Sequence, residues 1–147
     1  MERPSPWSRT AFPYFLEIQT RWMDNDMYGH VNNAVHYSYF DTAVNRYLID
    51  AGVLDVNNGP LLGLVVETAC NYFGEIAFPE RIFAGLRVTH IGRTSVRFEV
   101  ALFRNEDSLA AAQGHFVHVY VDRTTRRPMA LPEEMKKSLA ALVNERD

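Results

Sequence analysis

Two aspartates, Asp24 and Asp26, stand one residue apart in the segment 21–33, between a strand-like stretch and a predicted helix. A carboxylate can split an acyl bond either by attacking the carbonyl carbon or by taking a proton from water. The helix predicted to begin near Asn33 offers unpaired backbone N–H groups, which favour a developing negative charge. Asp26 beside that helix start is therefore the first candidate for a hydrolytic carboxylate facing an oxyanion site.

The neighbours of this carboxylate leave several roles open. Asp24 lies closer to the end of the strand, where it either pairs with Arg21 and holds the turn or is itself the reacting carboxylate. Gly29 is expected to supply a tight bend or a close approach of backbone to a ligand. His30 is expected to shuttle protons, to orient the carboxylate or to bond the loop backbone. No metal site is expected, because the spacing of His30 and His36 matches no common zinc pattern.

A second region with possible chemistry is the segment 90–95, in which a glycine is followed by Arg93, Thr94 and Ser95. An arginine and two hydroxyls can hold an anionic group such as a phosphate, although the same residues also suit an ordinary solvated hairpin. Glu67 is a carboxylate within an apolar strand-like stretch, where it either takes part in a site or points to solvent. Both regions are kept as candidates for substrate binding.

Composition limits the classes of function. The 147 residues suit one domain with its own core, and we expect 1–147 to fold as a single unit. A formal net charge of −3 gives no basic surface for nucleic acid, and no apolar run of about 18 residues could span a membrane. The N-terminus lacks the apolar segment of a signal peptide, and the lone Cys70, which we interpret as a small buried residue, cannot form an internal disulfide. A soluble cytoplasmic protein is expected.

The hydrophobic pattern predicts one long helix among antiparallel strands. Apolar residues recur every three or four positions over 33–51, which is typical of a helix packed on one side, and Asn32 or Asn33 is suited to cap its start. Alternating patterns elsewhere predict strands. The expected elements are an extended arm at 1–13, strands at 15–22, 64–76, 81–91, 95–104 and 109–122, and a short C-terminal helix at 132–145. Such an order indicates an α+β fold with the long helix on one face of a curled sheet.

Residues 24–33 read Asp-Asn-Asp-Met-Tyr-Gly-His-Val-Asn-Asn and are followed by Tyr37, Tyr39, Phe40 and Ala43. This pattern resembles the signature of the 4-hydroxybenzoyl-CoA thioesterase family of hotdog-fold enzymes. Supporting matches are Pro79 and the segments 88–95, 114–122, 127–128 and 131–132, so the similarity runs from residue 15 to residue 140. The first motif is specific, and the later ones support it because they recur in register.

The resemblance implies a hotdog fold, with a five- or six-stranded antiparallel sheet around the helix, and dimers or dimers of dimers with active sites at the subunit interface. It assigns the catalytic carboxylate to Asp26 and the oxyanion donor to a backbone N–H on or next to Asn33. It also implies that coenzyme A is bound by the partner subunit, at the turn formed by Arg93, Thr94 and Ser95. No metal and no redox cofactor is expected, since coenzyme A is part of the substrate.

One position departs from the family. Several members carry an aromatic or histidine side chain where this chain has Asn33. The Gly-His-Val-Asn-Asn version is also similar to plant acyl-carrier-protein thioesterases, in which histidine and asparagine side chains take part. His30 and Asn33 are therefore kept as catalytic candidates beside Asp26, and the carrier is left open between coenzyme A and an acyl carrier protein.

The predicted function is hydrolysis of a small acyl-, aryl- or other acyl-CoA thioester to the free acid and coenzyme A. A hotdog enoyl-CoA hydratase or dehydratase is an alternative, but its Asp-x-Asn-Pro-x-His pattern is not matched, because His30 follows Asp26 by four residues with no proline between them. A non-catalytic acyl-CoA-binding module is the other alternative. The residues expected to contact substrate are Gly29, Asn32, Tyr37, Phe40, Glu67, Arg93, Thr94 and Ser95. Tyr28, Tyr37 and Phe40 suit an aryl, a short alkyl or a quaternary ammonium group, so the acyl group is not named.

Overall fold

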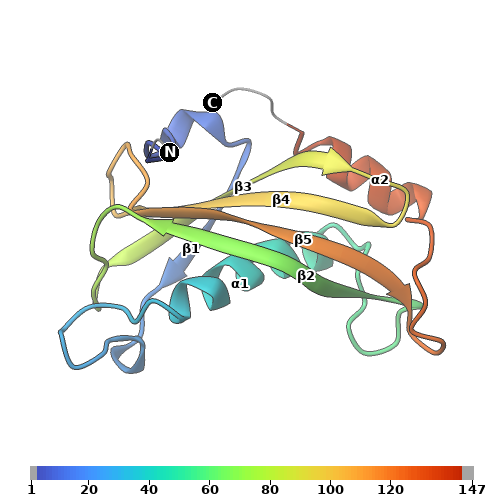
Figure 1. Cartoon of the computed structure of the whole chain (residues 1–147), viewed down its shortest axis with the longest axis horizontal. Helices are drawn as coiled ribbons and strands as arrows, with labels where there is room; N and C mark the ends of the chain where they lie inside the picture. The colour runs from blue at the N-terminus through green and yellow to red at the C-terminus, as the bar shows by residue number, and fades with distance from the viewer. Residues whose placement is uncertain (1–2, 144–147) are drawn as a thin grey trace.

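The computed structural model describes residues 3–143, which form one antiparallel sheet around a long helix (Figure 1). The sheet has five strands in the order β1-β3-β4-β5-β2, so β1 and β2 are its edges. The elements are β1 (Tyr14–Gln19), α1 (Val35–Asp50), β2 (Leu61–Tyr72), β3 (Arg81–Ile91), β4 (Ser95–Arg104), β5 (Ala112–Asp122) and α2 (Glu133–Ala140), with 3₁₀ turns η1 (Arg9–Ala11) and η2 (Trp22–Asp24). The predicted α+β architecture, a long helix wrapped by a curled antiparallel sheet, is confirmed.

The inner face of the sheet packs on α1. Phe40, Ala43, Val44 and Leu48, which follow the predicted helical spacing, are fully buried. The Phe40 ring meets Phe116 of β5 edge to face, with 5.8 Å between ring centroids. This packing fixes α1 against the strands that surround it, and with it the loop that leads into its N-terminus.

Two boundaries near the helix differ from the prediction. The helix begins at Val35 rather than at residue 33, because the Asn32 side chain accepts a hydrogen bond from the Ala34 N–H at 2.9 Å and stabilises a turn there. The first strand ends at Gln19, and Trp22 lies in η2 instead of continuing the alternation. The Asp24 carboxylate forms this turn by accepting the Arg21 N–H at 2.9 Å.

The edges of the later strands also shift, whereas β3 and β4 match the predicted ranges. β2 begins at Leu61 because its pairing with β5 extends to the end of that strand, where Leu61 faces Asp122. It ends at Tyr72, since the next two N–H groups both bond the carbonyl of Ala111. α2 begins one residue after the predicted start and ends at Ala140, while residues 144–145 of that prediction lie outside the described residues.

The N-terminal arm lies against the outer face of the sheet, away from α1. From residue 3 it runs without helix to η1, a 3₁₀ turn that interrupts the arm expected to be extended over 1–13, and Phe12 packs against Ala101 and Phe103 of β4. The first two residues of the predicted arm lie outside the described range. The sheet thus carries α1 on one face and a short crossing segment on the other.

Candidate functional site

The loop between β1 and α1 closes around a buried carboxylate. Asp24 is 2% exposed and accepts hydrogen bonds from the Tyr39 hydroxyl at 2.6 Å and from the Arg21 guanidinium at 3.0 Å. Burial alone would raise the pKa of the Asp24 carboxyl, but the hydrogen bonds from Tyr39 and Arg21 outweigh it and hold that pKa below its usual range. Its carbonyl also accepts the Asn32 N–H at 3.0 Å. Of the two interpretations of Asp24, the pairing with Arg21 is the one observed, and the residue ties both ends of the loop together.

Asp26 lies in the same loop but keeps part of its carboxylate open. Its Oδ1 accepts the N–H of Tyr28 at 2.9 Å, and its backbone pairs with His30 and Gly29 across a tight turn, each at 3.0 Å. Gly29 has a φ of +84°, a left-handed conformation that glycine adopts without a steric penalty. Oδ2 of Asp26 has no hydrogen-bond partner within residues 3–143, so one carboxylate oxygen is available to attack or to accept a proton.

The start of α1 offers one backbone donor beside this loop. The N–H groups of Ala34 and Val35 are occupied by the side chain and the carbonyl of Asn32, both at 2.9 Å. In the described part of the chain, the N–H of Asn33 has no acceptor, and the residue is exposed. A free N–H at the positive end of a helix dipole is suited to hold a developing oxyanion.

A cavity of about 230 Å³ adjoins the helix start. It is lined by Val31, Asn33, His36, Tyr72, Phe73, Gly74, Glu75 and Ile76. Nδ1 of the buried His36 lies 3.2 Å from the carbonyl of Asn32, so Nδ1 carries the proton and donates it. Burial lowers the pKa of His36, which keeps the ring neutral and leaves Nε2 as an acceptor.

Three polar side chains in this lining, those of His36, Tyr72 and Glu75, were not predicted as site residues. Tyr72, at the end of β2, donates its hydroxyl proton to the Asn33 carbonyl at 2.9 Å and meets the His36 ring with 4.9 Å between centroids. Glu75 lies 3.7 Å from His30 at the same end of the molecule. His36 stands one helical turn after Asn33, which is the one sequence signal that could have indicated it. Tyr72 lies 39 residues from Asn33 along the chain, and only the folding of β2 against α1 brings it and Glu75 to the loop.

Several predicted substrate contacts lie elsewhere in the single chain. Phe40 is buried in the core and Tyr37 packs partly against it. Glu67 lies on the outer face of the sheet, where its side chain is 65% exposed and pairs with His115 at 2.8 Å. The turn 93–95 joins β3 to β4 at the end of the sheet opposite the α1 start, as Figure 1 shows. Within one chain, Asp26, His30, Asn32 and Asn33 therefore lie in the same loop, whereas Glu67 and the 93–95 turn lie away from it.

Two further observations concern the described residues as a whole. Between residues 3 and 143, no group of three His, Cys, Asp or Glu side chains is arranged to hold a metal ion. In the same range, neither α1 nor α2 is long and apolar enough to cross a membrane.

An antiparallel sheet wrapped around one long helix, with a carboxylate loop at the helix start, is the hotdog fold of thioesterases. Residues 20–139 match the family model described as the thioesterase-like superfamily, and the chain belongs to that superfamily. The match covers the candidate loop and the whole sheet after β1, but not the N-terminal arm.

Solved structures and a curated relative are similar to this chain over most of its length. The PA5185 protein from Pseudomonas aeruginosa strain PAO1 is 50% identical, with a TM-score of 0.94 over 98% of this chain and 100% of its own. A thioesterase from Thermus thermophilus, crystallised with coenzyme A and zinc, is 32% identical, with a TM-score of 0.75 over 90% of this chain and 95% of its own. YsmA from Bacillus subtilis (strain 168) is 22% identical over 131 residues, 89% of this chain and 88% of its own.

Proposed function

We propose that this protein is an acyl-CoA thioesterase, with Asp26 as its reacting carboxylate and the Asn33 N–H as its oxyanion donor. The observation that carries the proposal is that one loop holds both a carboxylate with one unpartnered oxygen and, at a helix start, a backbone N–H without an acceptor among residues 3–143. The coenzyme A bound to the Thermus thioesterase, a relative at 32% identity, supports a CoA thioester as the substrate.

Two routes use the same atoms. In the first, Oδ2 of Asp26 attacks the thioester carbonyl, the thiolate of coenzyme A leaves, and water then hydrolyses the mixed anhydride to release the acid. In the second, Asp26 takes a proton from a water that attacks the carbonyl directly, and the thiolate leaves from the tetrahedral intermediate. In both, the carbonyl oxygen becomes negative and accepts the Asn33 N–H, a contact whose loss typically raises the barrier by about 2.7–4 kcal/mol.

The cavity at the helix start suits a small acyl group. Its volume of about 230 Å³ lies below the range of about 300–1,000 Å³ that is typical of drug-sized ligand sites. The rings of His36 and Tyr72 meet edge to face in its wall, and Nε2 of His36 can accept a hydrogen bond from a hydroxyl on the acyl group. We therefore expect a short acyl or an aryl group, including a hydroxylated aryl group, as the substrate.

A second copy of the chain would complete the site. β2 is an edge strand whose outer side pairs with no other strand among residues 3–143, and Val66 at its centre is 60% exposed. The strand runs from Leu61, at the end of the sheet that holds the 93–95 turn, to Tyr72 at the candidate site. Antiparallel pairing of two β2 edges reverses the second copy, so its 93–95 turn lies at the same end as the first copy's Tyr72. We propose that this homodimer brings Arg93 of one subunit toward coenzyme A bound at the other.

Thiol release from a panel of short-chain, long-chain and aromatic acyl-CoAs tests the activity. We expect turnover by the parent and a loss of about 10²–10⁴-fold in Asp26→Asn, because the amide neither attacks nor accepts the proton. Asp41→Asn, an exposed aspartate on α1, is the matched control and is expected to keep parental activity. Equal rates in Asp26→Asn and the parent would overturn the role of Asp26. Binding of acyl-CoA without turnover in the parent would establish a binding module instead.

Size-exclusion chromatography with light scattering tests the proposed dimer. The parent is expected to be a dimer, and Val66→Lys a monomer with at least tenfold lower turnover, because a charge on the paired edge opposes strand addition. Val56→Lys, an equally apolar residue that is 53% exposed in the loop before β2, is the control that should stay dimeric. A monomeric parent with full activity would contradict the interface.

A further inference from the structure

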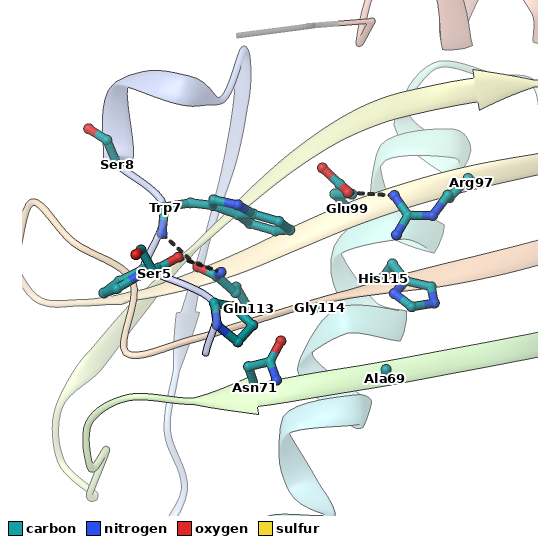
Figure 2. Close-up of a pocket in the computed structure, with 12 residues that line it drawn as sticks. Ser5, Trp7, Ser8, Ala69, Asn71, Arg97, Glu99, Gln113, Gly114 and His115 are labelled. Carbon is teal, nitrogen blue, oxygen red and sulfur yellow. Dashed lines mark hydrogen bonds and ion pairs between the residues drawn. The ribbon is translucent and has the colours of Figure 1, made fainter. Parts of the chain in front are cut away.

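A second and larger cavity lies on the outer face of the sheet. It encloses about 650 Å³ between the N-terminal arm and strands β2, β4 and β5. Figure 2 shows Trp7 and the arm on one side of it and Arg97 and His115 on the other, with Asn71 and Ala69 below. Nothing in the proposed hydrolysis uses these residues, and the arm lies outside the residues matched by the superfamily model.

The sheet separates this groove from the proposed active site. Side chains alternate along β5, so Phe116 points inward to contact Phe40 of α1 while His115 points outward into the groove. Ala69 of β2 stands directly opposite His115 and shares its face. A ligand in the groove therefore lies on the other side of β5 from α1, as the helix behind the strands in Figure 2 illustrates.

The wall formed by the arm is held in place by hydrogen bonds to the sheet. Gln113, which is buried, accepts the Trp7 N–H at 2.6 Å and donates to the Ser5 carbonyl at 3.0 Å. The Arg87 guanidinium stacks on the Trp7 ring at 4.6 Å from its centroid and fixes the orientation of the indole. A wall fixed in advance lowers the conformational entropy that the protein loses when a ligand binds.

On the polar side of the groove, Arg97 shares its anionic partner with a second arginine, and Glu67 pairs with the neighbouring His115. The buried Glu99 carboxylate accepts Arg87 at Oε1 and Arg97 at Oε2, so two cations share one anion. Within the described residues, Nη1 of Arg97 donates to Glu99 and Thr89, while its Nε and Nη2 have no acceptor. The free Nε–Nη2 edge of a guanidinium matches the two oxygens of a planar anion.

Part of the remaining lining suits a flat apolar body. The floor is formed by Ala69 and the backbone of Gly114, which have no long side chains, and the far wall by Pro6 and the Trp7 indole. A dianionic phosphate carries two charges, and it would meet only one free guanidinium edge beside the negative Glu99 carboxylate. A carboxylate carries one charge, and that single edge can donate to both of its oxygens. We propose that the groove is a second binding site, for a small aromatic carboxylate whose carboxylate pairs with Arg97 and whose ring rests against Trp7.

Fluorescence of Trp7 gives a readout specific to this groove. The chain has two tryptophans, so Trp22→Phe leaves Trp7 as the sole emitter. Benzoate is titrated into this full-length variant with excitation of the indole, and saturable quenching is expected. Benzyl alcohol, which has the ring without the charge, is expected to bind at least tenfold more weakly.

Substitutions then separate this site from the active site. In the Trp22→Phe background, Arg97→Met is expected to weaken benzoate binding at least tenfold, and its melting temperature shows whether it is folded. Arg104→Met is the matched control on the same strand, since Arg104 is 38% exposed against 36% for Arg97 and also pairs with acidic side chains. Arg104→Met should bind benzoate with the parent's affinity. Asp26→Asn should do so too, and its activity in the thiol assay is measured independently of this titration.

Four results would overturn the proposal. They are the absence of saturable quenching by benzoate, equal affinity in Arg97→Met and Arg104→Met, loss of binding in Asp26→Asn, and tighter binding of phenyl phosphate than of benzoate. The last would assign the groove to a phosphate ester rather than to a carboxylate.

Discussion

His118 makes a specific prediction about stability in acid. It lies on the inner face of β5, is 2% exposed and is surrounded by aromatic rings, with Phe98 at 5.2 Å and Phe116 at 5.5 Å between centroids. Its Nδ1 lies 3.4 Å from the Tyr120 hydroxyl, and among the described residues its Nε2 is the buried side-chain polar atom left without a partner. Burial lowers the pKa of His118 to about 4, because the apolar surroundings disfavour the charged ring.

The sign and size of the effect follow from this difference. An unfolded chain binds a proton at His118 below its ordinary pKa of about 6.5, whereas the folded chain does so only below about 4. The unfolding free energy is therefore unaffected by His118 above about pH 6.5. It falls as the pH is lowered from about 6.5 to about 4, and it stops falling below about pH 4. At about 1.4 kcal/mol per unit of pKa difference, the full loss of unfolding free energy is about 3 kcal/mol.

Urea unfolding of the parent and of His118→Phe between pH 8 and pH 4 measures this loss. At pH 8 the variant should lie within about 1 kcal/mol of the parent, because phenylalanine keeps the ring contacts and removes the unpaired nitrogen but leaves the Tyr120 hydroxyl without its partner. On acidification the variant should become more stable than the parent, by about 3 kcal/mol near pH 4. The buried His36 contributes to the pH dependence of both proteins and cancels in the comparison.

His90→Phe is the control, since His90 is an exposed histidine on β3. It should leave the pH dependence of the unfolding free energy unchanged. Parallel curves for the parent and His118→Phe would refute the reasoning, because they would show that His118 takes up its proton equally in the folded and unfolded chains.

Two further substitutions test the packing around the site. Tyr39→Phe removes the hydroxyl that donates to the buried Asp24 carboxylate, so the unfolding free energy should fall by about 1.5–3 kcal/mol. Tyr28→Phe, at an exposed position, is the control and should change the unfolding free energy little. Similar melting curves for the two variants would contradict the hydrogen bond between Tyr39 and Asp24. Gly114→Ala places a Cβ 1.9 Å from the backbone oxygen of Ala69 on β2, so denaturant titration should show an unfolding free energy lower by at least about 3 kcal/mol. Gly74→Ala is the control and should not lower it, because its Cβ would be 3.9 Å from its nearest neighbour. An unchanged stability of Gly114→Ala would mean that β2 and β5 are less closely paired than observed.

Local interactions explain what could be predicted before the structure. β3 and β4 match the predicted ranges because each shows a clear alternation of apolar and polar residues. A short turn separates the two strands, and they pair with each other. The stripe of Phe40, Ala43, Val44 and Leu48 fixed the buried face of α1, since helical spacing places these residues on one side. The helix was predicted to start at residue 33 but starts at Val35. The Asn32 side chain accepts the Ala34 N–H and so stabilises a turn before the helix.

The candidate carboxylates show where local reasoning stops. Asp24 and Asp26 stand one residue apart, and the local pattern keeps both open as the reacting carboxylate, although the family resemblance favours Asp26. Tyr39, fifteen residues away, makes the difference, because its hydroxyl reaches Asp24 and turns that carboxylate into part of the core. Asp26 stays half-buried in the same loop as the Asn33 N–H, which has no acceptor among the described residues. Their roles in catalysis remain predictions that the thiol assay tests.

By itself the sequence determined the order of elements, the helix face and the loop that carries Asp26, because each depends on residues close together in the chain. Only the tertiary structure decided which side chains share a cavity. Tyr72 joins His36 because β2 folds back against α1, and Trp7 lines the same cavity as Arg97 because the arm crosses the outer face of the sheet. Contacts of this kind are set by the packing of whole elements, and no spacing within a single segment records them.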